Sequence, residues 1–441
     1  MVMEVDTSAP VRILEKLKSG RFSAGVIGLG YVGLPLAVEL AKAGRQTVGI
    51  DVNRSCVEGI LAGRSHISDV SSDDLARLLG EGTLSATSDF SVCRELDVIV
   101  ICVPTPLTAT KDPDLSYVES AARSIEPFLR GDQLVVLEST TYPGTTEEVV
   151  LPILEAGDKK LGRDFYLAFS PERVDPGNTR HTISNTPKVL GGVTPDSTEA
   201  AKAFYQGIVN QVVPLSSAKA AELTKLLENI FRCVNIALVN ELMLLCHRMG
   251  IDVWEVIRAA STKPFGFMPF YPGPGLGGHC IPVDPFYLNW KAREYGFHTE
   301  FIELAGQTNE YMPHYVVERI TEALNEHSKA AKGSTLLILG VAYKKDVGDT
   351  RESPALKVME LLQARGADIK VHDPFVPEVK IDGKAYRSEP LSADLLASSD
   401  CAVILADHSN VDYDLVVSSA PLVVDSRNAL RAYTSDNIRR L

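Results

Sequence analysis

Continuous runs of Val, Ile and Leu alternate with amphipathic stretches, and this alternation constrains the fold more than any other feature of the chain. Near the start, residues 24–30 and 46–52 are typical of buried strands, with a helix expected over 32–43 between them. Further strands are expected at 96–104, 133–140, 165–171 and 188–193. Such strands, separated by helices, favour a parallel sheet that is covered on both faces and joined by right-handed crossovers.

A second alternating unit begins with the apolar run at 334–343. It continues with an expected helix at 354–365, followed by expected strands at 368–373, 401–407 and 421–426. The same pattern therefore predicts a second parallel sheet near the C-terminus.

Residues 218–250 separate the two units and contain no Pro, and no Gly before Gly250. Their apolar residues recur at helical spacing, at Leu223, Leu226, Leu227, Ile230, Phe231 and Val234. This pattern predicts one long helix that stops at Gly250 and could bridge two domains. Beyond it we expect a helix over 253–260 capped by Asp252, a loop over 263–287 and a helix over 300–326.

The fold expected from these patterns is α/β, with two doubly wound Rossmann-like domains joined by a long central helix. The predicted domains are residues 1–215, a helical segment at 216–325, and residues 326–441.

Composition excludes several kinds of partner. The net charge is -13 with no basic run, which argues against a nucleic-acid partner. No segment has about 18 uninterrupted apolar residues, so we expect no membrane span. The N-terminus lacks the pattern of a secretory signal, and the seven scattered cysteines show no CxxC pair. We therefore expect a cytoplasmic protein without disulfides or a metal site.

Gly28, Gly30 and Gly33 form a G-x-G-x-x-G motif between the first expected strand and helix. These glycines permit a tight turn, close approach of a pyrophosphate, and close packing of helix on strand. Asp51 ends the next strand, where its carboxylate would bind the ribose hydroxyls of NAD and repel the 2′-phosphate of NADP. The nearby Arg54 leaves NADP as an alternative, and a glycine turn that binds nothing is another.

Cys280 lies in GPGLGGHCIPVDP (273–285), a glycine-rich segment that offers little core for a buried thiol. Backbone N–H groups of such a loop, or a nearby cation, favour the nucleophilic thiolate. A small buried apolar residue is the alternative role for a free cysteine, and it suits Cys102, Cys233 and Cys246 better.

Lys225 and Asn229 are four residues apart on the long helix and share one face, with Glu222 one turn before Lys225. A lysine there could stabilise an alkoxide or oxyanion, with Asn229 as a neutral donor. Taken alone, the sequence favours a solvated helix flank instead.

Four further positions could contribute to a site. Asp284 could be a base for water or a structural loop acid. Thr140 and Glu172 follow expected strands, where ligands bind in open parallel sheets, but they could equally be loop or cap residues. Lys344, Lys345 and Arg351 follow another strand and indicate either a phosphate site or a charged loop.

With these motifs in hand, the chain resembles the UDP-glucose/GDP-mannose dehydrogenase family from about residue 22 to about residue 430. The motifs that carry the resemblance are GVIGLGYVGLP, ESTTYPGTT, SPER, AELTKLLEN, GPGLGGHCIPVDP and YKKDVGDTRESP. The resemblance implies an N-terminal NAD domain and a C-terminal UDP-sugar domain joined by a long helix. It also implies that this helix forms the interface of a homodimer or a higher homo-oligomer. It also implies two NAD-linked oxidations of the sugar C6 alcohol to a uronic acid, for polysaccharide precursors.

By motif position the resemblance also implies the site. Cys280 is the expected nucleophile, Lys225 stabilises the oxyanion with Asn229, and Asp284 assists water. Thr140 and Glu172 line the catalytic site. The remaining expected cofactor contacts are Tyr31, Val32, Thr105, Thr140 and Arg351, and the remaining expected substrate contacts are Glu172, Arg173, Tyr271, Gly273, Gly277 and Lys344.

One position departs from the UDP-glucose pattern, in which a second glutamate follows the SPE motif by four residues. Here that residue is Pro176. Together with the loop before Cys280, it indicates the branch that acts on UDP-N-acetylhexosamines, with UDP-N-acetylglucosamine expected ahead of UDP-N-acetylmannosamine and UDP-glucose. Two competing hypotheses are a 3-hydroxyacid dehydrogenase, which has a similar long helix, and a non-catalytic nucleotide-sugar sensor.

Overall fold

A computed structural model describes residues 12–67, 69–108, 110–173, 180–278 and 281–441. Two compact units divide the chain. Unit 1 comprises residues 1–228 and 286–295, and unit 2 comprises residues 229–285 and 296–441.

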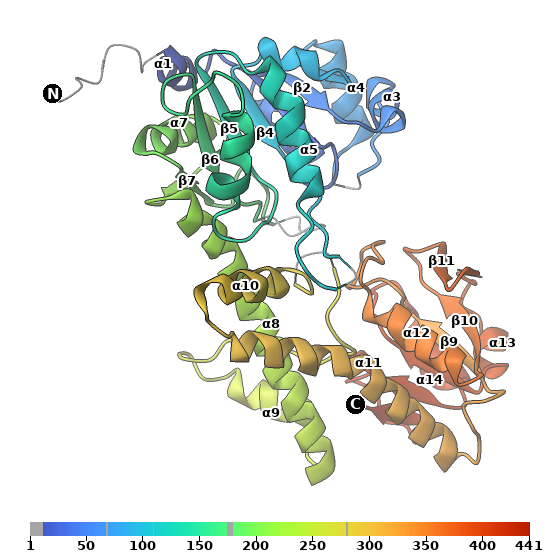
Figure 1. The fold of residues 1–441 in the computed structure, drawn as a ribbon. Coiled ribbons are helices and arrows are strands. Elements are labelled where there is room, and N and C mark those ends of the chain that lie inside the picture. The colour runs from blue at the N-terminus through green and yellow to red at the C-terminus, as the bar shows by residue number, and fades with distance from the viewer. Residues whose placement is uncertain (1–11, 68, 109, 174–179, 279–280) are drawn as a thin grey trace. The chain divides into compact units, whose positions relative to one another are not determined.

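Unit 1 is built on one eight-stranded sheet, ordered β3-β2-β1-β4-β5-β6-β7-β8. Its strands are β1 Ser23–Ile27, β2 Gln46–Ile50, β3 Leu84–Thr87, β4 Val98–Ile101, β5 Gln133–Leu137, β6 Phe165–Phe169, β7 Lys188–Gly192 and β8 Val212–Pro214. The strands from β3 to β6 pair in parallel, which confirms the expected doubly wound arrangement (Figure 1).

The expectation of a parallel strand at 188–193 is wrong in direction, because β7 pairs with β6 antiparallel. A parallel neighbour needs a crossover of a dozen or more residues, usually a helix. No helix lies between β6 and β7 in the described part of that connection. The chain therefore turns back, and β7 begins near the edge where β6 ends.

Helices cover both faces of the unit 1 sheet. They are α1 Arg12–Ser19, α2 Gly33–Lys42, α3 Arg54–Leu61, α4 Ser72–Gly80, α5 Ser116–Ile125, α6 Leu151–Leu154 and α7 Pro195–Gln206. One apolar core joins the sheet to α1, α2, α4 and α7, and a second joins the opposite face to α5 and α6.

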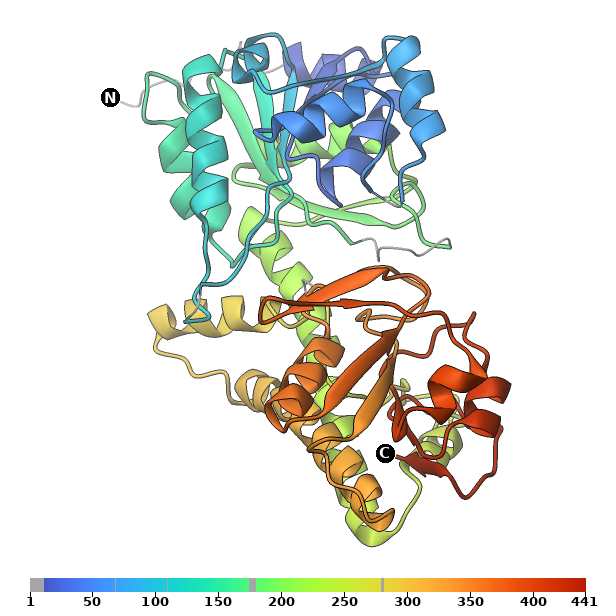
Figure 2. The same ribbon diagram turned by 90° about the vertical axis from the view of Figure 1, so that its right-hand side faces the viewer.

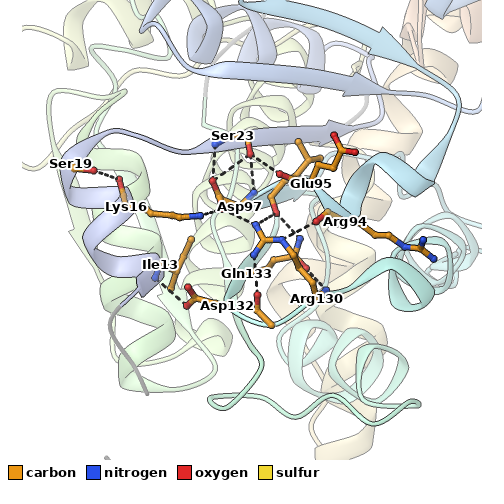
Figure 3. Close-up of polar contacts among 12 residues, drawn as sticks. Ile13, Lys16, Ser19, Ser23, Arg94, Glu95, Asp97, Arg130, Asp132 and Gln133 are labelled. Carbon is orange, nitrogen blue, oxygen red and sulfur yellow. Dashed lines mark hydrogen bonds and ion pairs between the residues drawn. The ribbon is translucent and has the colours of Figure 1, made fainter. Parts of the chain in front are cut away.

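A buried carboxylate fastens α1 to the amino-terminal edge of this sheet (Figure 3). Asp97, which immediately precedes β4, accepts hydrogen bonds at Oδ1 from Lys16 and Arg130, each at 2.7 Å. Its Oδ2 accepts the backbone N–H of Ser23 at 3.1 Å. This cluster lies at the opposite edge of the sheet from the glycine-rich loop, so we assign it a structural role.

Unit 2 contains a five-stranded parallel sheet, ordered β10-β9-β13-β14-β15, and an antiparallel pair, β11 and β12. The strands are β9 Thr335–Leu339, β10 Asp368–His372, β11 Glu378–Ile381, β12 Lys384–Arg387, β13 Cys401–Ile404, β14 Val423–Asp425 and β15 Ile438–Arg440. One face packs on α11 Glu300–Glu326 and α12 Pro354–Ala364, and the other on α13 Ala393–Ala397 and α14 Tyr413–Ser419 (Figure 2).

Helix α8, Ala218–Met249, confirms the predicted long helix, and the division between the two units falls within it. It stops at Gly250, whose φ is +68°. Its exposed large apolar residues form a stripe at helical spacing: Leu223, Leu227, Phe231, Leu238, Leu242, Leu245 and Met249. By length and composition alone α8 could also cross a membrane, although 33% of its most apolar window is buried.

The predicted loop over 263–287 is wrong at its C-terminal end, because α10 begins there and spans Asp284–Ala292. Pro285 is the second residue of α10, a position where the missing N–H costs no helical hydrogen bond. The predicted cap is confirmed, since Asp252 accepts the N–H of Trp254 at the start of α9, Val253–Ala260.

Candidate functional site

The glycine-rich loop joins β1 to α2, and steric limits distinguish its three glycines. Gly28 has φ +88°, and a Cβ there would lie 2.7 Å from the carbonyl oxygen of Cys102. A Cβ on Gly33 would lie 1.9 Å from the carbonyl oxygen of Gly28. A Cβ on Gly30 would meet no atom within 4 Å. Gly28 and Gly33 are thus required by the fold, whereas the open space at Gly30 fits a bound pyrophosphate.

Asp51 lies directly after β2, beside this loop. Its Oδ2 accepts the N–H of Leu29 at 2.8 Å, and its Oδ1 accepts the N–H of Asn53 at 2.8 Å. Arg54, the first residue of α3, lies three residues after Asp51 and is exposed. The carboxylate is therefore held at the sheet edge where the ribose of a dinucleotide binds.

The other expected cofactor residues of unit 1 lie on the same loop or follow strands of the same sheet. Tyr31 is 39% exposed and Val32 precedes the first residue of α2. Thr105 and Thr140, which follow β4 and β5, are half-buried. The carbonyl of Thr105 accepts a hydrogen bond from the Tyr287 hydroxyl at 2.9 Å. Sequence reasoning missed Tyr287 because the segment that contains it was expected to be a loop.

Lys225 is only 8% exposed and donates a hydrogen bond to the main-chain carbonyl of Glu172 at 2.7 Å. Glu222, one turn earlier, is fully buried and accepts the N–H groups of Gly144 and Thr146 at 2.6 and 2.9 Å. The prediction of a solvated helix flank is therefore wrong. This face of α8 packs on the loops that follow β5 and β6.

The side chain and backbone of Arg173 make contacts within unit 1. Its guanidinium pairs with Glu228 at 2.7 Å and donates to the carbonyl of Pro187 at 2.6 Å. The backbone N–H of Arg173 donates to the carboxylate of Glu172 at 2.7 Å. These contacts fix the SPER segment, and a substrate contact by Arg173 stays a prediction.

Asn229 and Asp284 meet within unit 2. The side-chain amide of Asn229 donates to Oδ2 of Asp284, and its carbonyl oxygen accepts from Arg232. Asn229 is fully buried and Asp284 is 2% exposed. The partners fix the orientation of the amide. Sequence reasoning missed Arg232, which lies three residues after Asn229 on the same helix.

Buried amides anchor the loop that leads towards Cys280. Asn240 accepts the N–H of Gly273 at 3.0 Å and donates to Asn309 at 2.9 Å. A Cβ on Gly277 would lie 2.5 Å from Cβ of Tyr343, so only glycine fits there. Tyr271 is 56% exposed. Cys280 itself and Pro176 lie outside the described residues.

The basic residues after β9 fall into different environments. Lys344 is half-buried. Arg351 pairs with Asp349 at 2.6 Å, and its carbonyl accepts the N–H of Gly278 at 3.0 Å. The main chain of Arg351 thus supports the loop that contains Gly278. A contact between Arg351 and a cofactor stays a prediction.

Most described cysteines are poor nucleophiles. Burial raises the pKa of Cys93 and Cys401 to about 12, and the pKa of Cys233 to about 11. Burial likewise raises the pKa of Cys102 well above its usual value. The role of small apolar core residue therefore fits Cys102 and Cys233, as expected.

Family models match nearly the whole chain. The NAD binding domain of the UDP-glucose/GDP-mannose dehydrogenase family matches residues 23–209, its central domain matches 219–311, and its UDP binding domain matches 337–432. The chain belongs to the UDP-glucose/GDP-mannose dehydrogenase family. It is an NAD-dependent UDP-sugar dehydrogenase.

Relatives in this family carry several substrate names. A UDP-N-acetyl-D-glucosamine 6-dehydrogenase of Pseudomonas aeruginosa is 38% identical, over 80% of this chain and 82% of that protein. An NDP-N-acetyl-D-galactosaminuronic acid dehydrogenase of Ralstonia nicotianae is 37% identical, over 91% and 95%. The structure of UDP-D-ManNAc dehydrogenase from Pyrococcus horikoshii aligns with a TM-score of 0.87 and 33% identity, over 95% of this chain and 98% of that one.

Proposed function

We propose that this dehydrogenase oxidises the C6 alcohol of UDP-N-acetylglucosamine to the uronic acid in two NAD-linked steps, for polysaccharide precursor synthesis. The observation that carries the substrate choice is the segment at 261–295, which resembles UDP-N-acetylglucosamine 6-dehydrogenases. Pro176 and the loop before Cys280 support the broader N-acetylhexosamine branch. The 38% identity to the Pseudomonas aeruginosa enzyme supports it. UDP-N-acetylmannosamine is the second candidate. It is supported by the TM-score of 0.87 between this chain and the UDP-D-ManNAc dehydrogenase of Pyrococcus horikoshii.

The chemistry requires the intermediate aldehyde to stay bound. Oxidation of a primary alcohol to a carboxylate removes four electrons, and one NAD accepts two. In the proposed mechanism the thiolate of Cys280 attacks the aldehyde to give a thiohemiacetal. Loss of a hydride from this adduct gives a thioester, which water hydrolyses to release the acid and the thiol.

Lys225, Asn229 and Asp284 supply the supporting roles in this proposal. The ammonium of Lys225, oriented by the carbonyl of Glu172, stabilises the alkoxide and the thiohemiacetal oxyanion. Asn229 assists through its amide, and Asp284 accepts a proton from the attacking water. Thr140 and Glu172 line the site.

The residues of unit 1 fit the cofactor. Gly28, Gly30 and Gly33 would hold the pyrophosphate at the start of α2, and Asp51 would hold the ribose. When bound there, NAD supplies the hydride acceptor. Tyr31, Val32, Arg54, Thr105, Thr140 and Arg351 are the remaining proposed cofactor contacts.

On the substrate side, we propose contacts from Glu172, Arg173, Lys225, Asn229, Tyr271, Gly273, Gly277 and Lys344. The proposed division assigns residues 1–215 to NAD, 216–325 to the helical domain and 326–441 to the UDP-sugar.

The exposed apolar stripe on α8 supports a homo-oligomer, at least a dimer. Leu227, Leu238 and Met249 along this stripe are 63%, 52% and 59% exposed. An apolar stripe at helical spacing is typical of a helix that packs against another helix. Burial of this stripe by a second copy would remove the apolar surface from water. We place the assembly in the cytoplasm, without nucleic-acid or membrane partners.

One assay tests the proposal. NADH formation is measured with UDP-N-acetylglucosamine, UDP-N-acetylmannosamine, UDP-N-acetylgalactosamine, UDP-glucose and GDP-mannose. We expect the highest kcat/KM with UDP-N-acetylglucosamine, and two NADH for each sugar consumed. A ratio of one would indicate an ordinary alcohol dehydrogenase, and a preference for another sugar would overturn the substrate assignment.

A further inference from the structure

A buried lysine, Lys188, lies between two carboxylates in unit 1. Its Nζ is 3.1 Å from Oε1 of Glu138 and 3.2 Å from Oε2 of Glu172. The ammonium also lies 5.2 Å from the ring centre of Tyr205, whose hydroxyl donates to Glu138. The side chains of Lys188, Glu138 and Glu172 are only 5%, 0% and 14% exposed.

The topology of the sheet explains how these residues meet. Glu138 directly follows β5 and Glu172 follows β6, so both lie at the carboxyl edge. The antiparallel pairing sets Ala168 opposite Gly192 and Phe169 opposite Gly191. If this register is extended past the end of β6, Glu172 lies opposite Lys188, the first residue of β7. Because β6 ends at the carboxyl edge, a neighbouring strand can begin at this edge only if it runs antiparallel to β6.

Electrostatics indicates that Lys188 is charged. Burial by itself lowers the pKa of Lys188, but the attraction of Glu138 and Glu172 outweighs burial and raises it. Burial raises the pKa of Glu138, whose Oε2 has no hydrogen-bond partner within the described residues. One ammonium therefore contacts two carboxylates, and its loss would remove this cation from the buried Glu138 and from the half-buried Glu172.

Glu172 connects Lys188 to Lys225. Its carboxylate contacts Lys188, while its main-chain carbonyl accepts the hydrogen bond from Lys225 at 2.7 Å. The next residue, Arg173, donates to the carbonyl of Pro187 at 2.6 Å, which ties the same two segments together a second time. A displacement of Glu172 would therefore move the group that orients Lys225.

We propose that Lys188 is a positioning residue for the oxidation, which holds the carboxylate of Glu172 ionised and in place and thereby fixes the carbonyl that orients Lys225. This inference rests on the proposed function, in which Glu172 and Lys225 belong to the active site.

A double-mutant cycle tests this role. The wild type, Lys188→Met, Glu172→Gln and the double variant are compared by kcat, KM and the pH dependence of kcat/KM. We expect Lys188→Met to lower kcat at least about tenfold. We also expect it to move the acidic limb that reports ionisation of Glu172 upward by about one pH unit, because a carboxylate that loses a nearby cation is protonated more readily. In the Glu172→Gln background, the same change should cost less than about threefold. Lys188→Arg should restore the pH profile.

Asp97→Asn is the matched control, since it disrupts another buried ion-pair cluster of the same sheet, at the opposite edge. It should lower stability without moving the acidic limb. Additive effects of Lys188→Met and Glu172→Gln, or an unmoved limb in Lys188→Met, would overturn the positioning role.

A fold-preserving comparison covers the case in which Lys188→Met does not fold. Lys188→Met is then made in a Glu138→Gln background, which removes one of the two buried carboxylates, and is compared with Glu138→Gln alone. The same upward movement of the acidic limb is expected, and its absence contradicts the proposal. A wild type that forms no NADH from any UDP-sugar would refute the proposed function instead, which distinguishes the two failures.

Discussion

The ammonium nitrogen of Lys225 lies 2.7 Å from the main-chain carbonyl oxygen of Glu172, to which it donates a hydrogen bond. An ammonium has three N–H donors, so this contact orients the group and leaves donors for an oxyanion. Because the side chain is 8% exposed, its charge acts in a site of low dielectric, where electrostatic stabilisation is strong.

Replacement of Lys225 should therefore damage catalysis more than folding. We expect Lys225→Met to lower kcat at least about a hundredfold, equivalent to about 3 kcal/mol of transition-state stabilisation. NADH formation under saturating substrate measures this loss. Lys202→Met, on α7 and partly exposed, is the control and should retain the wild-type kcat. A Lys225→Met enzyme within threefold of wild type would contradict the oxyanion role.

The three glycines of the β1–α2 loop should respond differently to alanine. At Gly33 a methyl group collides with the carbonyl of Gly28, so Gly33→Ala should lower the free energy of unfolding by about 1–3 kcal/mol. At Gly30 the space is open, so Gly30→Ala should keep wild-type stability and raise the Kd for NAD at least about tenfold, or 1.4 kcal/mol. Thermal unfolding and titration calorimetry separate these effects.

Gly80→Ala is the control for both substitutions, because a Cβ there meets no atom within 4 Å and Gly80 lies in α4, far along the chain from the loop. It should alter neither stability nor NAD affinity by a comparable amount. Equal losses of NAD affinity in Gly30→Ala and Gly80→Ala would remove the evidence for a pyrophosphate at Gly30.

Asn229→Asp introduces a second carboxylate beside Asp284. Two carboxylates that share a buried site raise the pKa of one of them, so the acidic limb of kcat/KM should move upward by about one pH unit or more. We also expect kcat to fall at least about tenfold. Asn235→Asp, on the same helix but more exposed, is the control. A pH profile identical to that of the control would exclude coupling between Asn229 and Asp284.

Asp97 should make stability depend on acid pH. Burial by itself raises its pKa, but hydrogen bonds from Lys16, Ser23 and Arg130 outweigh burial and hold it below the usual value. A depressed folded-state pKa stabilises the protein above the unfolded-state pKa, and this contribution is lost as pH falls through the folded-state value. The free energy of unfolding, measured by urea titration, should be about 2 kcal/mol lower in Asp97→Asn at neutral pH. The difference in the free energy of unfolding between the wild type and Asp97→Asn should shrink below about pH 4. A difference that stays constant with pH would show that the charge of Asp97 does not cause the stabilisation.

The sequence predicted helices and strands best where the spacing of apolar residues agrees with the residues that start or stop an element. Helix α11 was expected at 300–326 and has those bounds, and the stop of α8 at Gly250 follows from the permissive backbone of glycine. The direction of β7 could not be predicted, because a short apolar run carries no information about the orientation of its partner. The start of α10 was missed because the Gly- and Pro-rich segment before it resembles a loop.

Motif positions pointed to Lys225, Glu172 and Asp51 as proposed site residues, but not to the partners that hold them. Lys188 lies 16 residues from Glu172 in sequence and begins a strand whose pattern is that of ordinary core. Its contact depends on the antiparallel turn of the chain, a tertiary feature without a local signal. Arg232 was missed because an exposed arginine on a helix is usually a solvated side chain.

The most direct test of the account is whether uronic acid forms in the absence of the Cys280 thiol. Cys280→Ala and, as control, Cys102→Ala are incubated with NAD and UDP-N-acetylglucosamine, and the acid product is quantified by mass spectrometry. We expect Cys280→Ala to form no uronic acid, while Cys102→Ala forms it at close to the wild-type rate. Uronic acid formed by Cys280→Ala at a near-normal rate would contradict covalent catalysis.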